Sequence, residues 1–204
     1  MDRPIRRYPA VGACGLDCGL CTRYYAVGKS RCPGCCGPDF FNRHPTCSFI
    51  TCCVTKRGLE VCAECPEFPC SKFKSQEEYE RRDLPGYPPD RKILPNLHFI
   101  REHGMQEFAR QQRKRIRLLE KMITDFDDGR SRSCFCRACA LLDPGDLEGS
   151  LREANRRISV EVAPPTDIRS RAKLLRGLLS EAATSQGIEL RIRKPPEETR
   201  GALG

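Results

Sequence analysis

The sequence predicts a small metal-stapled irregular α+β module followed by a mainly α-helical region, with few short strands. Twelve of the 15 cysteines lie between Cys14 and Cys70, and the other three lie between Cys134 and Cys139. The segment 14–70 contains only seven Leu, Ile or Val residues. So few aliphatic side chains cannot bury enough apolar surface to offset the conformational entropy lost on folding. Cross-links are therefore expected to hold this segment together.

The expected cross-links are metal–thiolate bonds rather than disulfides. Disulfides are typical of secreted chains, and residues 1–13 lack the apolar stretch of a secretory signal. The cysteine count is odd, and no apolar run approaches the length of a membrane helix. We therefore expect a cytoplasmic protein with no membrane association, in which reduced thiolates bind metal.

Five segments are expected along the chain. They are an irregular lead-in, a cysteine-rich metal-binding module, a linker, a helical region with one C-terminal strand, and a tail, over 1–13, 14–82, 83–90, 91–194 and 195–204. The linker is assigned from the run DLPGYPPD, because Pro and Gly interrupt regular secondary structure.

Short elements are expected inside the cysteine-rich module. The pattern predicts a helix over 46–56 and a short strand over 59–61. Ser75 and Glu78 have the spacing of a capping box, which predicts a further helix over 76–82.

Helical periodicity dominates after the linker. Apolar residues three or four positions apart predict one helix that ends at Gly104 and a second over 105–126. The apolar face of the second helix consists of Met105, Phe108, Ile116, Leu119, Ile123 and Phe126.

Two more helices and one strand are expected towards the C-terminus. Asp143 is a suitable N-cap for the first helix, and Thr166 or Asp167 is suitable for the second. Apolar residues then alternate over 188–193, which predicts a short strand.

The cysteine spacing in the module is typical of thiolate metal ligands. A Cys-x2-Cys turn aims two sulfurs at one point, and two such turns complete a tetrahedral site. One expected site consists of Cys18, Cys21, Cys32 and Cys35. A second site, with looser spacing, consists of Cys47, Cys52, Cys62 and Cys65.

Each pair of adjacent cysteines is expected to supply one ligand, because neighbouring side chains point apart. Cys36 and Cys53 are accordingly set aside, and Cys134 has no assigned role. By number of ligands alone, a third site would consist of Cys14, Cys70, Cys136 and Cys139.

An iron–sulfur centre is the alternative to zinc. Cys14, Cys18 and Cys21 have the C-x3-C-x2-C spacing that can bind a [4Fe–4S] cluster and leave one iron open for a substrate or cofactor. Thiolates suit zinc and iron–sulfur clusters alike, and the turn-like spacing favours zinc. The alternative function is redox or sulfur chemistry at that open cluster.

Four cysteine-rich or apolar motifs follow one another as GACGLDCGLC (12–21), CPGC (32–35), GLEVCAECPEFPC (58–70) and LPNLHFIREHGMQEF (94–108). In this order they resemble an uncharacterised cysteine-rich bacterial and archaeal domain family, over roughly residues 10–125. The resemblance implies a small cytosolic metal-binding protein, frequent in anaerobes, and implies no substrate or reaction. CFCRAC (134–139), Cys36 and Cys53 have no counterpart in the family pattern.

A basic face is expected on the helix over 105–126, opposite its apolar face. It consists of Arg110, Arg113, Lys114, Arg117 and Lys121. Such a face can follow nucleic-acid phosphates, as in a zinc-ribbon-like nucleic-acid binder. The formal net charge is +9, but a zinc ion bound by four thiolates is net negative, so much of this excess can balance the metal sites. Nucleic-acid binding is therefore possible but not favoured.

No residue set in the sequence indicates a reaction. A nucleophilic cysteine needs a base beside it, and the chain contains three His. We therefore expect a metal-binding protein with an interaction or regulatory role, for which an unknown protein partner is possible. Whether it is an enzyme stays open, and the absence of a reaction is favoured.

Overall fold

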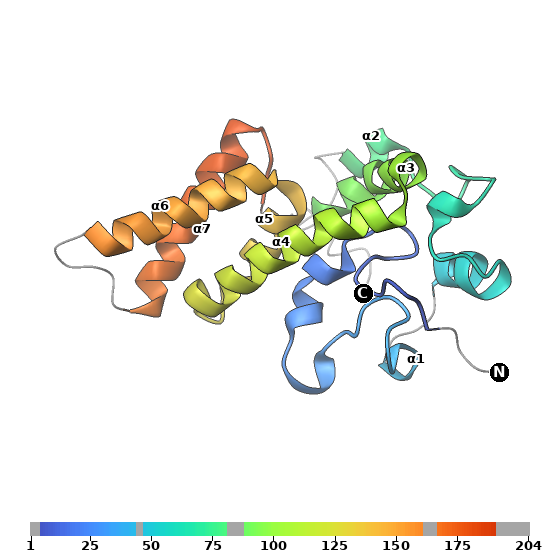
Figure 1. The fold of residues 1–204 in the computed structure, drawn as a ribbon, viewed down its shortest axis with the longest axis horizontal. Helices are drawn as coiled ribbons and strands as arrows, with labels where there is room; N and C mark the ends of the chain where they lie inside the picture. The colour runs from blue at the N-terminus through green and yellow to red at the C-terminus, as the bar shows by residue number, and fades with distance from the viewer. Residues whose placement is uncertain (1–4, 44–46, 81–87, 161–166, 191–204) are drawn as a thin grey trace, which may run out of the picture.

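The computed structural model describes residues 5–43, 47–80, 88–160 and 167–190. Loops and short helices occupy one end of the molecule, and α6 (Pro144–Val160) and α7 (Ile168–Ser185) occupy the other (Figure 1). The long helix α4 (Met105–Phe126) runs between the two ends and contacts both. The cysteine-rich half therefore packs directly against the helices.

The N-terminal half consists of short elements because Gly or Pro interrupts it every few residues. The 3₁₀ turns are η1 (Cys18–Leu20), η2 (Thr22–Tyr25), η3 (Gly28–Ser30), η5 (Cys62–Glu64) and η6 (Pro88–Lys92). The remaining elements are α1 (Phe40–Arg43), the π-helix η4 (Ile50–Lys56) and α2 (Gln76–Glu80).

Two predicted helices of this half are confirmed in part. Helical backbone runs over 48–56, mostly as η4, and Gly58 follows it with a φ of 65°. Ser75 and Glu78 form the expected capping box at the start of α2, since each backbone N–H donates to the other side chain at 2.8 and 3.2 Å. The last two residues of the predicted 76–82 helix lie outside the described residues.

The prediction of an α+β fold with short strands is wrong for the described residues, none of which forms a strand. Val61 is extended, with φ −150° and ψ 152°, but no strand lies beside the segment 59–61. The next N–H, from Cys62, donates instead to the carbonyl of Ala13 in a loop, at 2.9 Å. An extended segment becomes a strand only when a partner strand accepts its backbone hydrogen bonds.

The second predicted strand, over 188–193, is also absent from its described part. Residues 188–190 are irregular, and 191–193 lie outside the described residues. Leu190 is buried, and its carbonyl accepts a hydrogen bond from the Arg137 guanidinium. In the described part of this segment, Ile188 and Leu190 therefore pack against the helical core without forming a strand.

The long helices confirm the periodicity of the C-terminal half. α3 (Ile93–His103) ends at Gly104, whose φ is 85°, and α4 has the predicted bounds. Asp143 precedes α6, and the Asp167 carboxylate caps α7 by accepting the Ser170 N–H at 2.9 Å. None of the described helices is long and apolar enough to cross a membrane.

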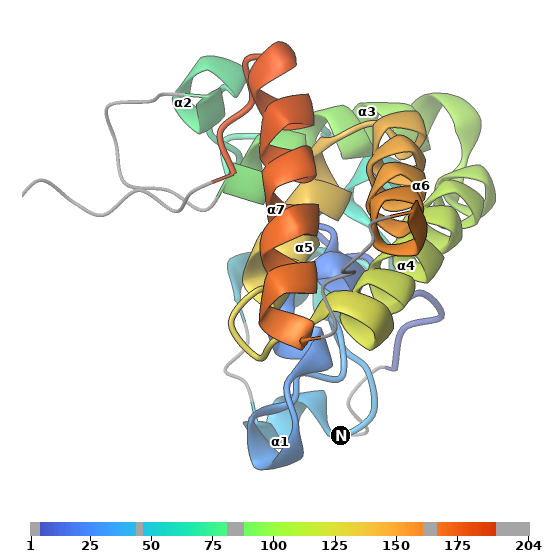
Figure 2. The same cartoon turned by 90° about the vertical axis from the view of Figure 1, so that its left-hand side faces the viewer.

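Helix α5 (Arg132–Leu141) was not predicted. Seven of its ten residues are buried, and they include Cys136, Arg137 and Cys139. α6 and α7 lie side by side with α5 behind α7 (Figure 2). A helix surrounded by other helices has no polar face, so its sequence shows no apolar stripe.

Two apolar cores meet along α4. One core joins α3 and Phe108 of α4 to buried residues of the cysteine-rich half. Its members from that half include Val11, Ile50, Val61 and Phe68. The other core joins the C-terminal part of α4 to α5, α6 and α7, and takes Leu20 from η1. The position of the cysteines is thus fixed by helices that follow them in the chain.

Candidate functional site

Four cysteines gather around Cys18, and we call these five residues the first thiol group. They are Cys14, Cys18, Cys21, Cys32 and Cys35. Burial raises the pKa of the Cys18 thiol well above its usual value, and the other four thiols raise it further because negative charge on them would repel a thiolate at Cys18. All 15 cysteines of the chain are free thiols.

The loops of the first group direct backbone N–H groups at sulfur. The Ala13 N–H donates to Cys35 Sγ at 3.5 Å. Further backbone hydrogen bonds, to Cys14 at Leu16 and to Cys32 at Gly34, favour the thiolate forms of those cysteines. Burial outweighs the bond at Cys14 and raises the pKa of that thiol to about 11.

The turn between Cys32 and Cys35 requires glycine. Gly34 has a φ of 86°, and a Cβ at this position would lie 2.3 Å from the carbonyl oxygen of Pro9. The Cys35 N–H donates to that same oxygen at 2.8 Å. The N-terminal segment and the CPGC turn therefore hold each other in place.

Five other cysteines line one small cavity of about 110 Å³, and we call them the second thiol group. They are Cys52, Cys53, Cys62, Cys65 and Cys70. η4 supplies Cys52 and Cys53, the η5 turn supplies Cys62, and Cys65 directly follows that turn. Phe49, Phe68 and Phe73 form much of the remaining wall, so the thiols face a largely apolar space.

Cys53 and Cys62 are in direct contact in the second group. Their thiols are hydrogen-bonded, which lowers the pKa of Cys53 and raises that of Cys62. The Cys53 thiol also lies 3.7 Å from the Leu59 carbonyl oxygen. The sequence prediction set Cys53 aside, whereas the structure places it among the candidate ligands.

Cys36 does not point away from Cys35, contrary to the expectation for adjacent side chains. Its φ is 56°, in the left-handed region, and its thiol is hydrogen-bonded to Cys35. This bond, the Ala13 N–H and the Arg6 guanidinium together lower the pKa of Cys35 to about 6. Cys35 is therefore the thiol of the first group most readily converted to thiolate.

Arg6 lies between the two thiol groups. Its side chain is only 1% exposed, and its Nη2 lies 3.4 Å from Oε1 of Glu60. Its positive charge lowers the pKa of Cys35, in the first group, and of Cys53, in the second. Its Nε and Nη2 make no hydrogen bond of good geometry among the described residues, and the guanidinium interacts with the Cys35 thiol. Negative charge on the neighbouring sulfurs would complete the surroundings of this buried cation.

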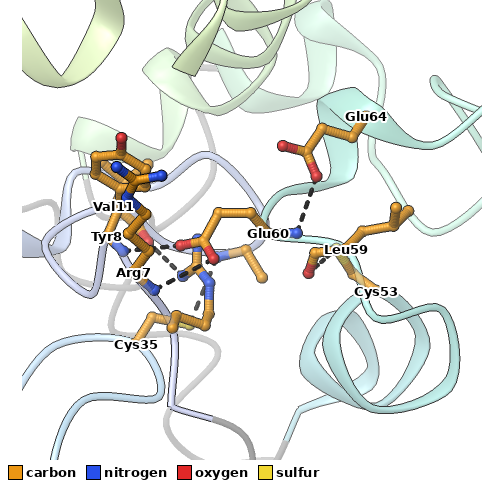
Figure 3. Close-up of polar contacts among 10 residues, drawn as sticks. Arg7, Tyr8, Val11, Cys35, Cys53, Leu59, Glu60 and Glu64 are labelled. Atoms are coloured by element: carbon orange, nitrogen blue, oxygen red, sulfur yellow. Dashed lines mark hydrogen bonds and ion pairs between the residues drawn. The ribbon is translucent and has the colours of Figure 1, made fainter. Parts of the chain in front are cut away.

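The Glu60 carboxylate fixes the segment that carries Arg6. It accepts the backbone N–H groups of Arg7 and Tyr8 at 3.3 and 2.8 Å (Figure 3). The Glu60 N–H in turn donates to the Glu64 carboxylate at 2.9 Å. Sequence reasoning missed Arg6 and Glu60, because a single arginine in an irregular segment belongs to no periodic or spaced pattern.

The structure groups several cysteines differently from their spacing. Cys47 is exposed and interacts with Cys14 and Cys36, so it lies near the first group and not the second. Cys14 and Cys70 belong to the first and second groups, and neither has a contact with Cys136 that the structure records.

The predicted third site is therefore not assembled. Cys136 is buried, interacts with Thr22 and Cys21, and has its pKa raised to about 12, mainly by burial. Cys139 Sγ lies 3.8 Å from the sulfur of Met122 inside the helical core. Cys134 is half-buried on the same helix, and burial raises its pKa. These thiols behave as small core residues.

No three or more Cys, His, Asp or Glu of the described residues are placed closely enough to hold a metal ion. The donor types nevertheless fit a soft metal, because two groups of thiols face inward and backbone N–H groups point at several sulfurs. A bound ion would require the sulfurs of a group to move closer together.

Part of the predicted basic face lines a cavity. Arg110, Arg113, Lys114 and Arg117 line a cavity of about 400 Å³ between α4 and the start of α6. Lys121 lies outside it and forms an ion pair with Asp125 at 2.7 Å.

Together these features define a class: a helical protein whose N-terminal part is built from loops around two groups of free thiols. Residues 10–75 match the family described as "Protein of unknown function (DUF3795)". The match contains both thiol groups and confirms the resemblance over this segment, although the motif at 94–108 and CFCRAC lie outside it. No curated protein and no solved structure matches the chain.

Proposed function

We propose that this protein binds metal through two thiolate sites in its cysteine-rich half, with zinc as the preferred ion. Its role in the cytoplasm would be interaction or regulation, without turnover of a substrate. The observation that carries the proposal is the gathering of ten cysteines from a short segment into two groups, one around Cys18 and one around a single cavity.

Several contacts of the sulfurs favour thiolates, while burial raises the pKa of Cys14, Cys18 and Cys32. Backbone N–H groups aimed at Cys14, Cys32 and Cys35 favour the charged form, as does the buried guanidinium of Arg6. A purely structural cluster of neutral thiols would need neither feature. Metal binding would deprotonate the sulfurs and supply the charge that balances Arg6.

The low aliphatic content of residues 14–70 is a reason to expect that bound metal stabilises this segment. Zinc–thiolate bonds add directly to folding free energy, because the sites do not exist in the unfolded chain. In this proposal, metal binding draws the sulfurs of each group together from their positions in the structure. Spectra of the cysteine-rich half should therefore change when metal is added to the metal-free protein.

An iron–sulfur cluster is the alternative occupant of the first group. Cys14, Cys18 and Cys21 belong to that group, as the C-x3-C-x2-C spacing requires. Such a cluster would support redox or sulfur chemistry instead of a structural role. Zinc remains preferred because the same group contains the four-thiolate set Cys18, Cys21, Cys32 and Cys35.

Elemental analysis of protein purified without oxygen tests the proposal. The expected result is a colourless protein with about two zinc ions per chain, as four thiolates per ion imply. Iron in the protein, together with absorption near 400 nm, would show that an iron–sulfur cluster is bound instead of zinc. A folded protein without metal, in which the thiols of both groups react freely with a thiol reagent, would contradict both forms of the proposal.

A further inference from the structure

A cationic cavity lies outside both thiol groups, between α4 and the start of α6. Its volume is about 400 Å³, which is within the range of small-ligand sites. The lining residues are Arg110, Gln111, Arg113, Lys114, Arg115, Arg117, Asp143 and Pro144. Five of these side chains are cations and only Asp143 is an anion, so positive charge predominates in the lining.

Three of the five cations have protein partners. Arg110 pairs with Glu107 at 2.6 Å, and Lys114 pairs with Glu148 at 3.0 Å. Arg115 donates to two backbone carbonyls at the C-terminal end of α5, which fixes its guanidinium beside the cavity.

Arg113 and Arg117 have no ion pair or hydrogen bond among the described residues. They are one helical turn apart on α4, so their side chains are neighbours on one face of the helix. Two unpaired guanidiniums at this spacing repel each other unless an anion lies between them. Each can bind a phosphate through two parallel N–H···O bonds.

We propose that this cavity binds a compact oligophosphate, meaning inorganic pyrophosphate or tripolyphosphate or the phosphate chain of a nucleotide. Arg113 and Arg117 would bind the phosphate oxygens directly, and Arg110, Lys114 and Arg115 would supply additional positive potential. This inference does not rest on the proposed metal sites, which lie in the other half of the molecule.

A compact ligand fits the cavity better than a nucleic acid does. The next cation along the face, Lys121, is already paired with Asp125. Glu107 and Glu148 are bound to cations of the cavity wall, which places carboxylates at its edge. The unpaired positive charge is thus concentrated at one place, whereas binding along a nucleic-acid backbone needs a continuous basic track.

Calorimetric titration of the full-length protein with tripolyphosphate tests the proposal at physiological salt. The wild type should bind one tripolyphosphate per chain, and it should bind sulfate at least about tenfold more weakly, since one phosphoryl-sized anion can meet only part of the cation set. The variant Arg113→Gln/Arg117→Gln should lose at least about tenfold in tripolyphosphate affinity, which corresponds to the loss of one charge-assisted contact or more.

The matched control removes the same charge elsewhere. Arg169 and Lys173 are exposed on α7 and do not line the cavity. The variant Arg169→Gln/Lys173→Gln should therefore keep tripolyphosphate affinity within about twofold, because screening limits distant surface charges. All three proteins should have the same circular dichroism spectrum and melting temperature, since the substituted side chains are exposed.

Three outcomes would overturn the proposal. The first is no tripolyphosphate binding by the wild type at millimolar concentration. The second is an equal loss in both double variants, which would mean general charge attraction. The third is that a DNA or RNA oligonucleotide binds more tightly than tripolyphosphate and depends on Arg113 and Arg117, which would assign the cavity to nucleic acid instead.

Discussion

The two halves of this molecule bury very different side chains. The core formed by α5, α6, α7 and the end of α4 contains Phe126, Phe135, Leu147, Leu175 and Leu179, each with no exposed surface. The core of the cysteine-rich half contains four buried cysteines, and two charged side chains, Arg6 and Asp17, are buried in the same half. The helical half also buries Arg137, Cys136 and Cys139, but large apolar side chains make up most of its core, whereas they are few in the cysteine-rich half.

Burial has opposite consequences in the two halves. In the helical half, each buried methylene contributes favourably to folding. In the cysteine-rich half, burial penalises charge: it raises the pKa of Asp17 to about 6, although Asn96 donates to that carboxylate at 3.1 Å. A region that buries charges and thiols with so few aliphatic residues needs a further source of free energy, and metal–thiolate bonds would supply it.

The largest effect of a single substitution is expected in the helical core. Phe135→Ala should lower the free energy of unfolding by about 4 kcal/mol, because it leaves a cavity where the ring has no exposed surface. Denaturant unfolding measures this loss. Bound metal, measured by elemental analysis, should stay unchanged in the folded variant, and a parallel loss of metal would show that the two halves are not stabilised independently.

Removing the buried cation should affect the other half. Arg6→Ala should lower the free energy of unfolding by about 3 kcal/mol, since it leaves Glu60 and the nearby sulfurs without their buried positive charge. It should also lower metal affinity, which competition with a chromogenic chelator measures.

Arg7→Ala is the matched control, because Arg7 is exposed and only its backbone N–H contacts Glu60. This control should change stability by less than about 0.5 kcal/mol and leave metal affinity intact. Equal behaviour of the two variants would show that Arg6 has no special relation to the thiols.

A smaller effect is expected where the two halves meet. Asn96 of α3 donates to the Gly15 carbonyl at 2.9 Å and to Asp17, so Asn96→Ala should lower the free energy of unfolding by about 2 kcal/mol. Glu102→Ala, on the exposed side of α3, is the control and should have little effect. If the two substitutions cost the same, the polar contact does not hold α3 against the cysteine-rich half.

The sequence predicted the helical half well where a helix has one polar face. The bounds of α4 and the Asp167 cap follow from periodicity and capping chemistry, which are local properties. α5 was missed because its neighbours surround it, and the strands at 59–61 and 188–193 were wrong because alternation cannot show whether a partner strand exists. Local patterns therefore failed where the outcome depended on distant residues.

The candidate site was predictable in composition but not in grouping. Spacing identified Cys18, Cys21, Cys32 and Cys35 as companions, and these four do lie together. Spacing could not place Cys47, Cys53 or Cys70, because loops of ten residues close in many ways until contacts such as Gly34 against Pro9 fix them. Arg6 was missed because a single arginine in an irregular segment belongs to no periodic or spaced pattern.

Hydrogen exchange before and after chelation tests the central claim most directly. The protein, purified without oxygen, would be compared with the same protein after a strong chelator has removed its metal. The account predicts that backbone protection over residues 14–70 is lost while α6 and α7 remain protected, because only the first region depends on metal for folding. Unchanged protection over residues 14–70 after complete metal removal would contradict the account.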